Sequence, residues 1–303
     1  MQLKSHISFV RELVKQGGPK PEHYDELNNK FSSIAKTIRN SSHPEHMISS
    51  IREALNDALT IETIQGYGFN KPFGYSGDFY MIDKIYQKHI SPDDNLRNWD
   101  IYFHSQKAPI AVRNRKQYFL DLLDKIRSHN QSDTLQILNI ACGPCRDVYE
   151  YLDTTKDKNI HFHCVDYDQN AIKYASNICE KYLDQITFYH KNALRFRSNI
   201  KFDVAWSAGL LDYFTDKQFK FMLKKLYSLV TQEGEVVVGN FHPDNPSRDY
   251  MEIVGDWYLN YRTEFDLIKL AKSAGFCLNN IRVGVEEEYV NLFLHIKCGK
   301  SFI

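Results

Sequence analysis

The sequence predicts an α/β fold in which a seven-stranded, mostly parallel sheet ends in an antiparallel hairpin and follows a helical domain. Beyond about residue 133, short apolar runs alternate with amphipathic segments, as they do in layered α/β sheets. Before that point, apolar residues recur at spacings of three and four, which is the helical period. Near the end, residues 282–289 join two apolar runs with too few residues for a crossover helix, so these runs must pair as a hairpin.

The pattern beyond residue 133 places each element of the sheet domain. Strands are expected at 136–141, 160–165, 185–190, 202–207, 235–240, 278–284 and 289–297. Helices are expected at about 145–154, 169–183, 216–230 and 263–274, with an apolar-aromatic helix at 249–261. Six polar residues at 128–133 mark the boundary between a helical domain over 1–128, expected to cap the active site, and a sheet domain over 129–303.

The helical period breaks at residues 65–80, which contain four glycines, one proline and six aromatic residues. Permissive backbone positions beside rigid rings favour a loop that folds over a ligand. The alternative is an aromatic surface loop that packs on the second domain.

Composition limits the classes of partner. The 303 residues carry 38 Lys and Arg against 38 Asp and Glu, so the net charge gives no argument for nucleic acid or an anionic membrane. No apolar run approaches the ~20 residues of a membrane span, and the first residues do not resemble a signal peptide. We therefore expect a cytoplasmic protein that acts on a small molecule; a homodimer remains open.

A nucleotide cradle is predicted between residues 135 and 168. The buried strand at 136–141 leads to Gly143, whose missing Cβ allows close approach of a ligand. Pro144 fixes the turn, and the helix that follows offers free N–H groups at its start. Asp166 ends the next strand, where a carboxylate can accept both hydroxyls of a ribose. This arrangement suits an adenosine.

The same turn also contains a C-x-x-C motif, formed by Cys142 and Cys145. Redox chemistry of the thioredoxin type is the competing interpretation, because a helix start stabilises thiolates. Thioredoxin-like folds place a cis-proline opposite the cysteines, and no proline occurs between Pro144 and Pro243. No metal site is predicted, since no second ligand pair has suitable spacing among the six cysteines, which also lack a disulfide-framework pattern.

Four motifs, at 138–145, 164–166, 202–209 and 226–238, resemble in order and spacing those of Rossmann-fold S-adenosylmethionine-dependent methyltransferases. That family's sheet also ends in an antiparallel hairpin. The resemblance implies S-adenosylmethionine as cofactor. The cofactor-binding residues that it implies are Ala141, Gly143, Pro144, Asp166, Tyr167, Asn192, Ala193, Ser207 and Ala208.

The chain departs from the family pattern at four positions, and at one of them Asn139 stands where the family commonly has an acidic residue. Ala141 and Cys145 stand where the family usually has the first and third glycine of its turn. Asn192 matches the usual adenine-contacting Asp, and its side chain keeps an acceptor oxygen and adds a donor. These departures leave the implied cofactor unchanged.

A narrower resemblance covers nearly the whole chain. Residues 74–80, 99–100, 111–115 and 239–243 look like a bacterial group of methyltransferases with a helical N-terminal extension. Some members of that group are associated with the biosynthesis of 3-hydroxypalmitic acid methyl ester. The resemblance therefore implies a methyl ester as product.

The acceptor is expected at the carboxyl edge of the sheet. A carboxylate acceptor needs an orienting cation and hydrogen-bond donors, whereas a phenol or amine needs a general base. Candidate catalytic residues are Tyr75, His242 and Asp212, and candidate substrate-binding residues are Tyr75, Tyr213, Arg248, Trp257, Tyr261, Arg262 and Arg113. For Trp257 and Tyr261, the alternative role is packing between the domains. For Arg248 and Arg262, it is a solvated salt bridge.

Together these observations predict carboxyl O-methylation of a small apolar acid, such as a fatty or aromatic acid. O- or N-methylation of an aromatic metabolite is the alternative reaction. A domain that binds the nucleoside only as a sensor is the alternative without catalysis.

Overall fold

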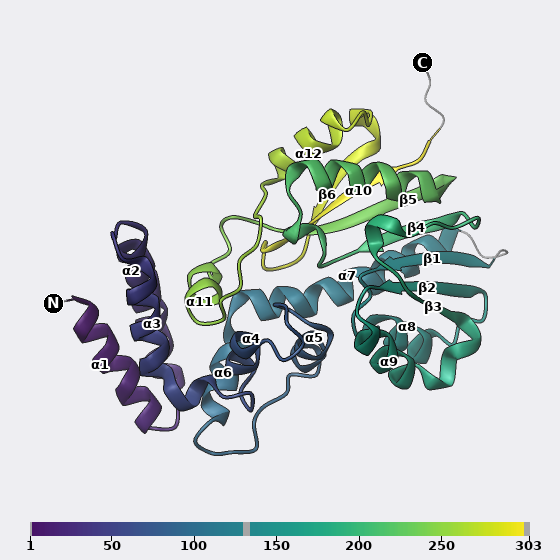
Figure 1. The fold of residues 1–303 in the computed structure, drawn as a ribbon. Coiled ribbons are helices and arrows are strands. Elements are labelled where there is room, and N and C mark those ends of the chain that lie inside the picture. The colour runs from purple at the N-terminus through teal and green to yellow at the C-terminus, as the bar shows by residue number, and fades with distance from the viewer. Residues whose placement is uncertain (1, 130–133, 300–303) are drawn as a thin grey trace. The chain divides into compact units, whose positions relative to one another are not determined.

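The computed structural model describes residues 2–129 and 134–299, and it forms two compact units (Figure 1). One unit comprises Met1–Ile110 and Asn245–Tyr258, and the other comprises Ala111–Asp244 and Leu259–Ile303. The predicted linker at 128–133 lies largely outside the described residues, so the domain boundary placed there stays a prediction. Among the described residues, no helix combines the length and apolar character that crossing a membrane requires.

The first unit is helical. Its helices are α1 (Gln2–Lys15), α2 (Tyr24–Arg39), α3 (Pro44–Leu55), α4 (Ile64–Asn70), α5 (Phe79–Tyr86), α6 (Arg97–Ser105) and α11 (Arg248–Ile253). The predicted apolar stripe of α2 is confirmed, because Leu27, Phe31 and Ile34 are buried. Tyr250 of α11 completes this core, since its ring lies 5.4 Å from that of Phe31 and its hydroxyl hydrogen-bonds to Gln65.

The prediction of one loop over 65–80 is wrong in its first part, where α4 forms. Thr63 caps this helix by accepting from the Gly66 N–H at 3.0 Å. Gly66 serves close packing here, since a Cβ added to it would lie 2.0 Å from the Thr60 carbonyl oxygen. Only residues 71–78 form a loop, with φ of 84° at Gly74 and 68° at Gly77.

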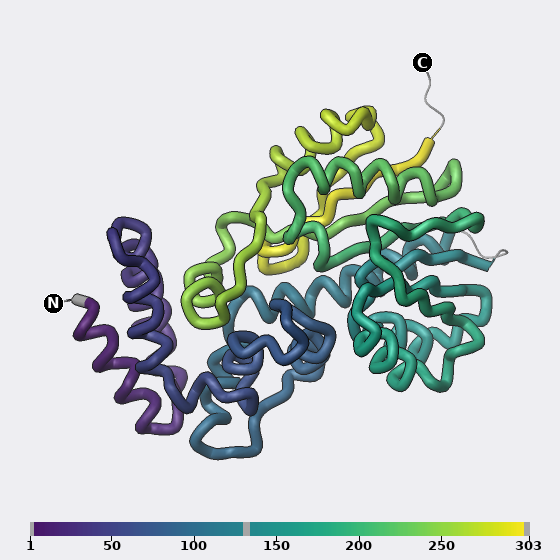
Figure 2. Tube along the Cα trace, viewed as in Figure 1, coloured from purple at the N-terminus to yellow at the C-terminus, as the bar shows by residue number. Residues whose placement is uncertain are grey.

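The second unit is built on a seven-stranded sheet, as predicted, and its strands follow the order β3-β2-β1-β4-β5-β7-β6. Figure 2 follows the chain through it, from teal β1 to yellow β7. Its strands are β1 (Leu135–Ile140), β2 (Ile160–Asp166), β3 (Ile186–His190), β4 (Phe202–Ser207), β5 (Val230–Phe241), β6 (Ile281–Val285) and β7 (Asn291–Lys297). All pairs are parallel except β5 with β7 and β6 with β7, which confirms the predicted hairpin.

Helices cover both faces of this sheet (Figure 1). The helices are α7 (Lys107–His129, of which the part from Ala111 belongs to this unit), α8 (Arg146–Thr155), α9 (Gln169–Ile178), α10 (Asp216–Leu229) and α12 (Glu264–Ser273). One apolar core includes Phe119, Val148 and Trp206, and the other includes Leu138, Phe219 and Leu267. The helix predicted at 249–261 is shorter than expected, because the chain leaves the helical conformation at Asp256, where φ is 50°.

A buried polar network links α7 to the antiparallel end of the sheet. His295 Nδ1 lies 2.9 Å from a Glu235 carboxylate oxygen, and its Nε2 lies 2.7 Å from the Tyr118 hydroxyl. His295 is 1% exposed and Glu235 is 7% exposed. Burial lowers the pKa of His295 below its usual 6.5, although Glu235 opposes this shift. For Glu235, burial is outweighed by its bonds to His295 and by Arg282, so its pKa lies below 4.5.

These two shifts predict lower stability in acid. A group with a depressed folded-state pKa stabilises the fold above its unfolded pKa and loses that contribution as pH falls through the folded value. We expect the unfolding free energy to fall as pH drops below about 6.5, first through His295 and then, below about 4.5, through Glu235. Urea unfolding at several pH values measures this. In the Glu235→Gln variant, the unfolding free energy should depend less on pH in the lower part of this range. An unchanged pH dependence would contradict the contribution assigned to Glu235.

Candidate active site

The candidate site lies at the carboxyl ends of β1, β2 and β4. The strand order reverses between β1 and β4, which is where open α/β sheets bind their ligands. The Ser207 hydroxyl at the end of β4 donates to the Ile140 carbonyl at 3.1 Å. This hydrogen bond fixes the ends of the two strands beside each other, so Ser207 supports the site from a fully buried position.

The turn after β1 has an unusual backbone. Ala141, Gly143 and Cys145 all have positive φ, of 53°, 55° and 51°. Ala141 and Cys145 therefore adopt the left-handed conformation although neither is glycine, and this conformation costs about 1–2 kcal/mol at each residue. The Cys145 N–H donates to the Cys142 carbonyl at 3.2 Å and closes the turn. A Cβ added at Gly143 would have no atom within 4 Å, so this face of the turn is open to a ligand.

Asp166 ties this turn to β2. One carboxylate oxygen accepts from the Gly143 N–H at 3.0 Å, and the other accepts from the Asp168 N–H at 2.9 Å. Burial raises the pKa of Asp166 above its usual value, and these N–H donors oppose that shift. Each oxygen keeps a lone pair for one ribose hydroxyl. The open turn and this carboxylate fit the adenosine part of the predicted cofactor.

Replacing Asp166 tests this role. We expect Asp166→Ala to weaken cofactor affinity by roughly 1–3 kcal/mol, because charged hydrogen bonds are lost. Isothermal titration calorimetry with S-adenosylhomocysteine measures the change. Asp168→Ala is the matched control, since Asp168 caps α9 by accepting from the Asn170 N–H. Equal losses in the two variants would refute a ribose-binding Asp166.

The other predicted cofactor residues lie around the same edge. Asn192 caps a short 3₁₀ turn by accepting from the Leu194 N–H at 2.9 Å, which leaves its amide N–H groups for an adenine. Ala193 and Ala208 are half-buried, Pro144 is buried and Tyr167 is 73% exposed. Their contacts with a cofactor stay predictions.

Asp212 lies in the loop after β4, as predicted. It is 3% exposed, and one carboxylate oxygen accepts from the Phe241 N–H at 2.7 Å. Burial raises the pKa of Asp212 to about 6, against the opposing effects of that N–H group and of Arg115 and Arg262. A carboxylate with this pKa is suited to general base catalysis near neutral pH.

The geometry favours a supporting role for Arg262 over substrate binding. Its guanidinium donates to four main-chain or side-chain oxygens and to the carboxylate of Asp216. The acceptors are the carbonyls of Leu211, Phe214 and Asn260, the side chain of Asn240 and Asp216. All five N–H groups are therefore used, and the side chain is only 5% exposed. Substrate binding by Arg262 stays a prediction that this geometry does not favour.

His242 follows β5 and keeps one ring nitrogen available. The Asp244 N–H donates to Nδ1 at 3.1 Å, so the neutral ring carries its proton on Nε2. No described residue hydrogen-bonds to Nε2, and the side chain is 23% exposed. His242 can therefore donate a hydrogen bond to an acceptor molecule.

The remaining predicted acceptor residues are divided between the two units. Tyr75, Arg248 and Trp257 belong to the helical unit. There Tyr75 is 40% exposed, Trp257 is half-buried, and Arg248 donates to Glu252 at 2.7 Å. In the sheet unit, Tyr213 is 40% exposed and Tyr261 is half-buried, while burial lowers the pKa of Arg113. Their roles at the acceptor stay predictions.

One buried cation was not among the predicted site residues. Arg115 of α7 is 8% exposed, and a Cβ added at Gly209 would lie 3.1 Å from its Nη1. Its guanidinium therefore packs on the loop after β4, close to Asp212. The signal for it was present in the sequence, because Arg115 follows Val112 by three residues and precedes Phe119 by four, on the apolar face of the helix.

The C-x-x-C motif is more extensive in the structure than in the sequence. The sulfur atoms of Cys142, Cys145 and Cys164 all lie within 4.8 Å of one another. The spacing did not reveal the third thiol, because it comes from the neighbouring strand β2. Burial raises the pKa of the Cys145 thiol well above its usual value.

Comparison with known proteins agrees with this fold. A possible exported protein from Bordetella parapertussis is similar over 98% of this chain and 96% of its own, with 14% identity and a TM-score of 0.62. Magnesium protoporphyrin IX methyltransferase from Synechocystis PCC 6803, with bound S-adenosylhomocysteine, has 16% identity and a TM-score of 0.50, over 63% of this chain and 86% of its own. A proposed O-methyltransferase from Nostoc punctiforme PCC 73102 has 15% identity and a TM-score of 0.52, over 79% of this chain and 71% of its own.

At these identities the structural likeness concerns the fold alone, and it confirms the predicted Rossmann-like α/β class with its helical N-terminal region. No curated protein matches the sequence. Residues 137–234, however, match a family described as a methyltransferase domain. This match confirms the predicted enzyme class, a methyltransferase.

Proposed function

We propose that this enzyme methylates the carboxylate of a small apolar acid, such as a fatty or aromatic acid, and uses S-adenosylmethionine as methyl donor. The observation that supports S-adenosylmethionine as the donor is the open left-handed turn at 141–145, which is hydrogen-bonded to Asp166. When bound, the donor supplies an electrophilic methyl group on a sulfonium. The Synechocystis enzyme of similar fold binds the demethylated form of the same cofactor.

The site's polar groups favour a carboxylate acceptor. A carboxylate is ionised near neutral pH, so the protein needs only to orient it and exclude water. His242 offers its Nε2–H group as a hydrogen-bond donor, and buried Arg115 supplies positive charge beside the loop after β4. With such an acceptor, no proton has to be removed at the reacting oxygen.

A screen with labelled methyl donor tests both parts of the proposal. The full chain is incubated with methyl-deuterated S-adenosylmethionine and separate panels of fatty acids, aromatic acids, phenols and amines, and products are identified by mass spectrometry. Methyl esters are cleaved by mild base, whereas methyl ethers and N-methyl groups are not. We expect base-labile label from the acid panels alone. Base-stable label would overturn the acid acceptor, and absence of cofactor binding in calorimetry would overturn the donor.

A second reaction, methylation of a phenol or amine, is favoured by one observation. Asp212 has a pKa of about 6 and lies in the loop after β4, where it can act as general base. In that case kcat/KM should fall as pH drops below about 6, because the protonated carboxyl cannot accept the proton. With a carboxylate acceptor we expect no such fall until the acceptor itself is protonated. The pH profile of kcat/KM for Asp212→Asn separates the two reactions. Unfolding of the same variant is the control, because the substitution also changes the hydrogen bond from the Phe241 N–H.

A further inference from the structure

Three buried thiols form one cluster beside the cofactor turn. Cys142, Cys145 and Cys164 are 6%, 0% and 0% exposed, and their sulfur atoms all lie within 4.8 Å of one another. The methyl-transfer chemistry proposed above uses none of them. They are therefore available for a separate role.

The fold holds the cluster together through backbone contacts. The hydrogen bond from Cys145 to Cys142 closes the turn and keeps these two residues near each other. Cys164 lies opposite Asn139 in the register of β1 and β2, two residues before the end of β2. The Cys142 N–H donates to the Val165 carbonyl at 3.2 Å, which joins the turn to β2 directly beside Cys164.

The spacing suits one shared cation. Thiolate sulfurs bind Zn²⁺ at about 2.3 Å, which places two of them roughly 3.8–4.0 Å apart in tetrahedral or trigonal geometry. The three sulfur atoms lie within 4.8 Å of one another, and this upper limit is compatible with such separations. Cys179 is also buried, but it lies outside this group, and its sulfur donates instead to the Cys145 carbonyl at 3.7 Å.

A second observation is independent of the sulfur atoms. Asn139 is 2% exposed, and its amide nitrogen has no hydrogen-bond partner. Residues opposite each other in adjacent strands point to the same face of a sheet, so Asn139 and Cys164 share a face. Neutral thiols are weak acceptors, whereas thiolates accept hydrogen bonds strongly. A charged sulfur cluster would provide an acceptor on the face that now holds an unpaired donor.

We propose that Cys142, Cys145 and Cys164 bind a soft, thiophilic metal cation. Each thiol releases its proton to solvent and becomes a ligand, with no change of oxidation state, and the cation's charge offsets the burial of the thiolates. Among the described residues, no fourth His, Cys, Asp or Glu joins the group. Soft cations that thiolates select are Cu⁺ and Zn²⁺. Cu⁺ fits three thiolates alone, whereas Zn²⁺ needs a fourth ligand from outside this group of described residues.

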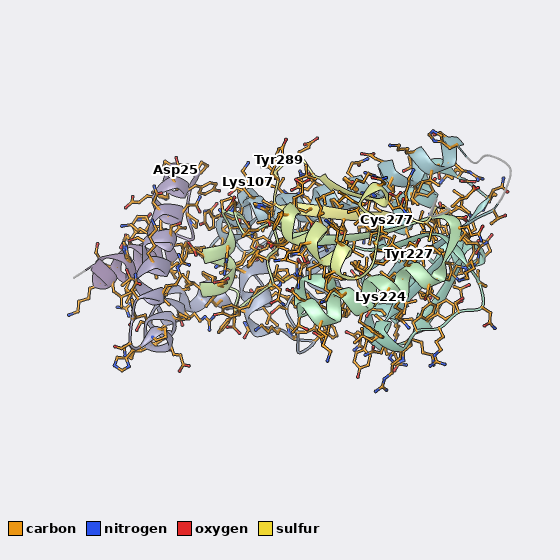
Figure 3. The ribbon with its side chains drawn as sticks, turned by 90° about the horizontal axis from the view of Figure 1, so that it is seen from above. Asp25, Lys107, Lys224, Tyr227, Cys277 and Tyr289 are labelled. Atoms are coloured by element: carbon orange, nitrogen blue, oxygen red, sulfur yellow. The ribbon has the colours of Figure 1, made fainter. Side chains whose placement is uncertain are left out.

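Metal titration of the full chain tests this site. The background is a Cys277→Ser, Cys298→Ser variant, because Cys277 is exposed (Figure 3) and Cys298 is half-buried, and both could bind metal adventitiously. Metal-free protein, kept reduced with a phosphine, is titrated anaerobically with Cu⁺ and separately with Zn²⁺ against a chromogenic chelator. We expect one equivalent to bind and the thermal unfolding temperature to rise. Binding of Cu⁺ alone indicates three-coordinate ligation, and binding of both ions indicates a fourth, external ligand.

Variants in the same background locate the site. Cys164→Ser should weaken metal binding by more than about 100-fold, since even loss of groups that only orient a ligand costs 10–100-fold. Cys164→Ala serves as the second variant if the serine is poorly tolerated in the core. Cys179→Ala is the matched control and should bind metal as the background does. No binding of either ion, or equal affinity in the folded Cys164 variants, overturns the proposal. These measurements need no methyl acceptor, so they stand or fall separately from the proposed reaction.

Discussion

Gly143→Ala is expected to weaken cofactor binding by roughly a hundredfold or more while leaving the protein folded. The new Cβ meets no protein atom within 4 Å, so the folded chain has room for it. The φ of 55° is of a kind that alanine adopts at about 1–2 kcal/mol, as Ala141 of the same turn already does at 53°. The space that the Cβ enters is the open face of the turn. A cofactor bound there would be displaced, at a loss of about 3 kcal/mol or more, or roughly a hundredfold in affinity.

Gly275→Ala is the matched control for this substitution. Gly275 follows α12, has φ of 101°, and also has no atom within 4 Å of a built Cβ. An alanine at this position would be strained in the same unit, and Gly275 is not part of the turn at 141–145. We expect both variants to lose some thermal stability, and only Gly143→Ala to lose binding of S-adenosylhomocysteine in calorimetry. Normal affinity in a folded Gly143→Ala protein would show that the cofactor does not approach this face.

The features that could be predicted from the sequence are those set by local chemistry or by chain order. The strand after residue 135, Gly143 and Asp166 were predicted because a tight turn needs an open backbone position and the carboxyl ends of parallel strands meet at one edge. The closing hairpin followed from the shortness of its connection. Both kinds of inference depend on residues close in sequence or on a simple topological rule.

The features that were missed depend on contacts between distant segments. Cys164 joins the C-x-x-C turn only through the register of β1 and β2. The first part of 65–80 has the composition of a loop but forms α4. Gly66 is needed in this helix because only a residue without a Cβ can pack against residue 60. Composition alone cannot distinguish a glycine required for flexibility from one required for space.

Arg262 illustrates the same difficulty for charged side chains. From the sequence, an arginine near the carboxyl edge of the sheet suggests binding of an acid. Its partners in the structure are mostly main-chain carbonyls of the segment 211–214 and residue 260, and such acceptors leave no mark on the sequence. The residue's role therefore has to be tested by its effect on stability.

Arg262→Met is expected to destabilise the sheet unit by about 3–5 kcal/mol, the range found when one partner of a buried charged network is removed. The ion pair with Asp216 contributes little of this, because the Asp216 side chain is 69% exposed. The larger loss comes from the Leu211, Phe214 and Asn240 oxygens, which would be left without this donor. Methionine keeps the apolar contact with Phe219, whose ring lies 4.6 Å from the guanidinium carbon.

Arg282→Met provides the comparison that decides between support and substrate binding. Arg282 lies in the same unit, is 48% exposed, and its ion pair is with Glu235 at 3.2 Å. Its replacement should cost less in urea unfolding than that of Arg262, because the Arg282 side chain is half exposed and Glu235 keeps its bond to His295. If Arg262 supports the loop after β4, its replacement lowers the unfolding free energy far more than that of Arg282 does. If it binds the acceptor instead, Arg262→Met unfolds like Arg282→Met, and its effect appears as a raised KM for the acid, because only an interaction with the substrate has been lost.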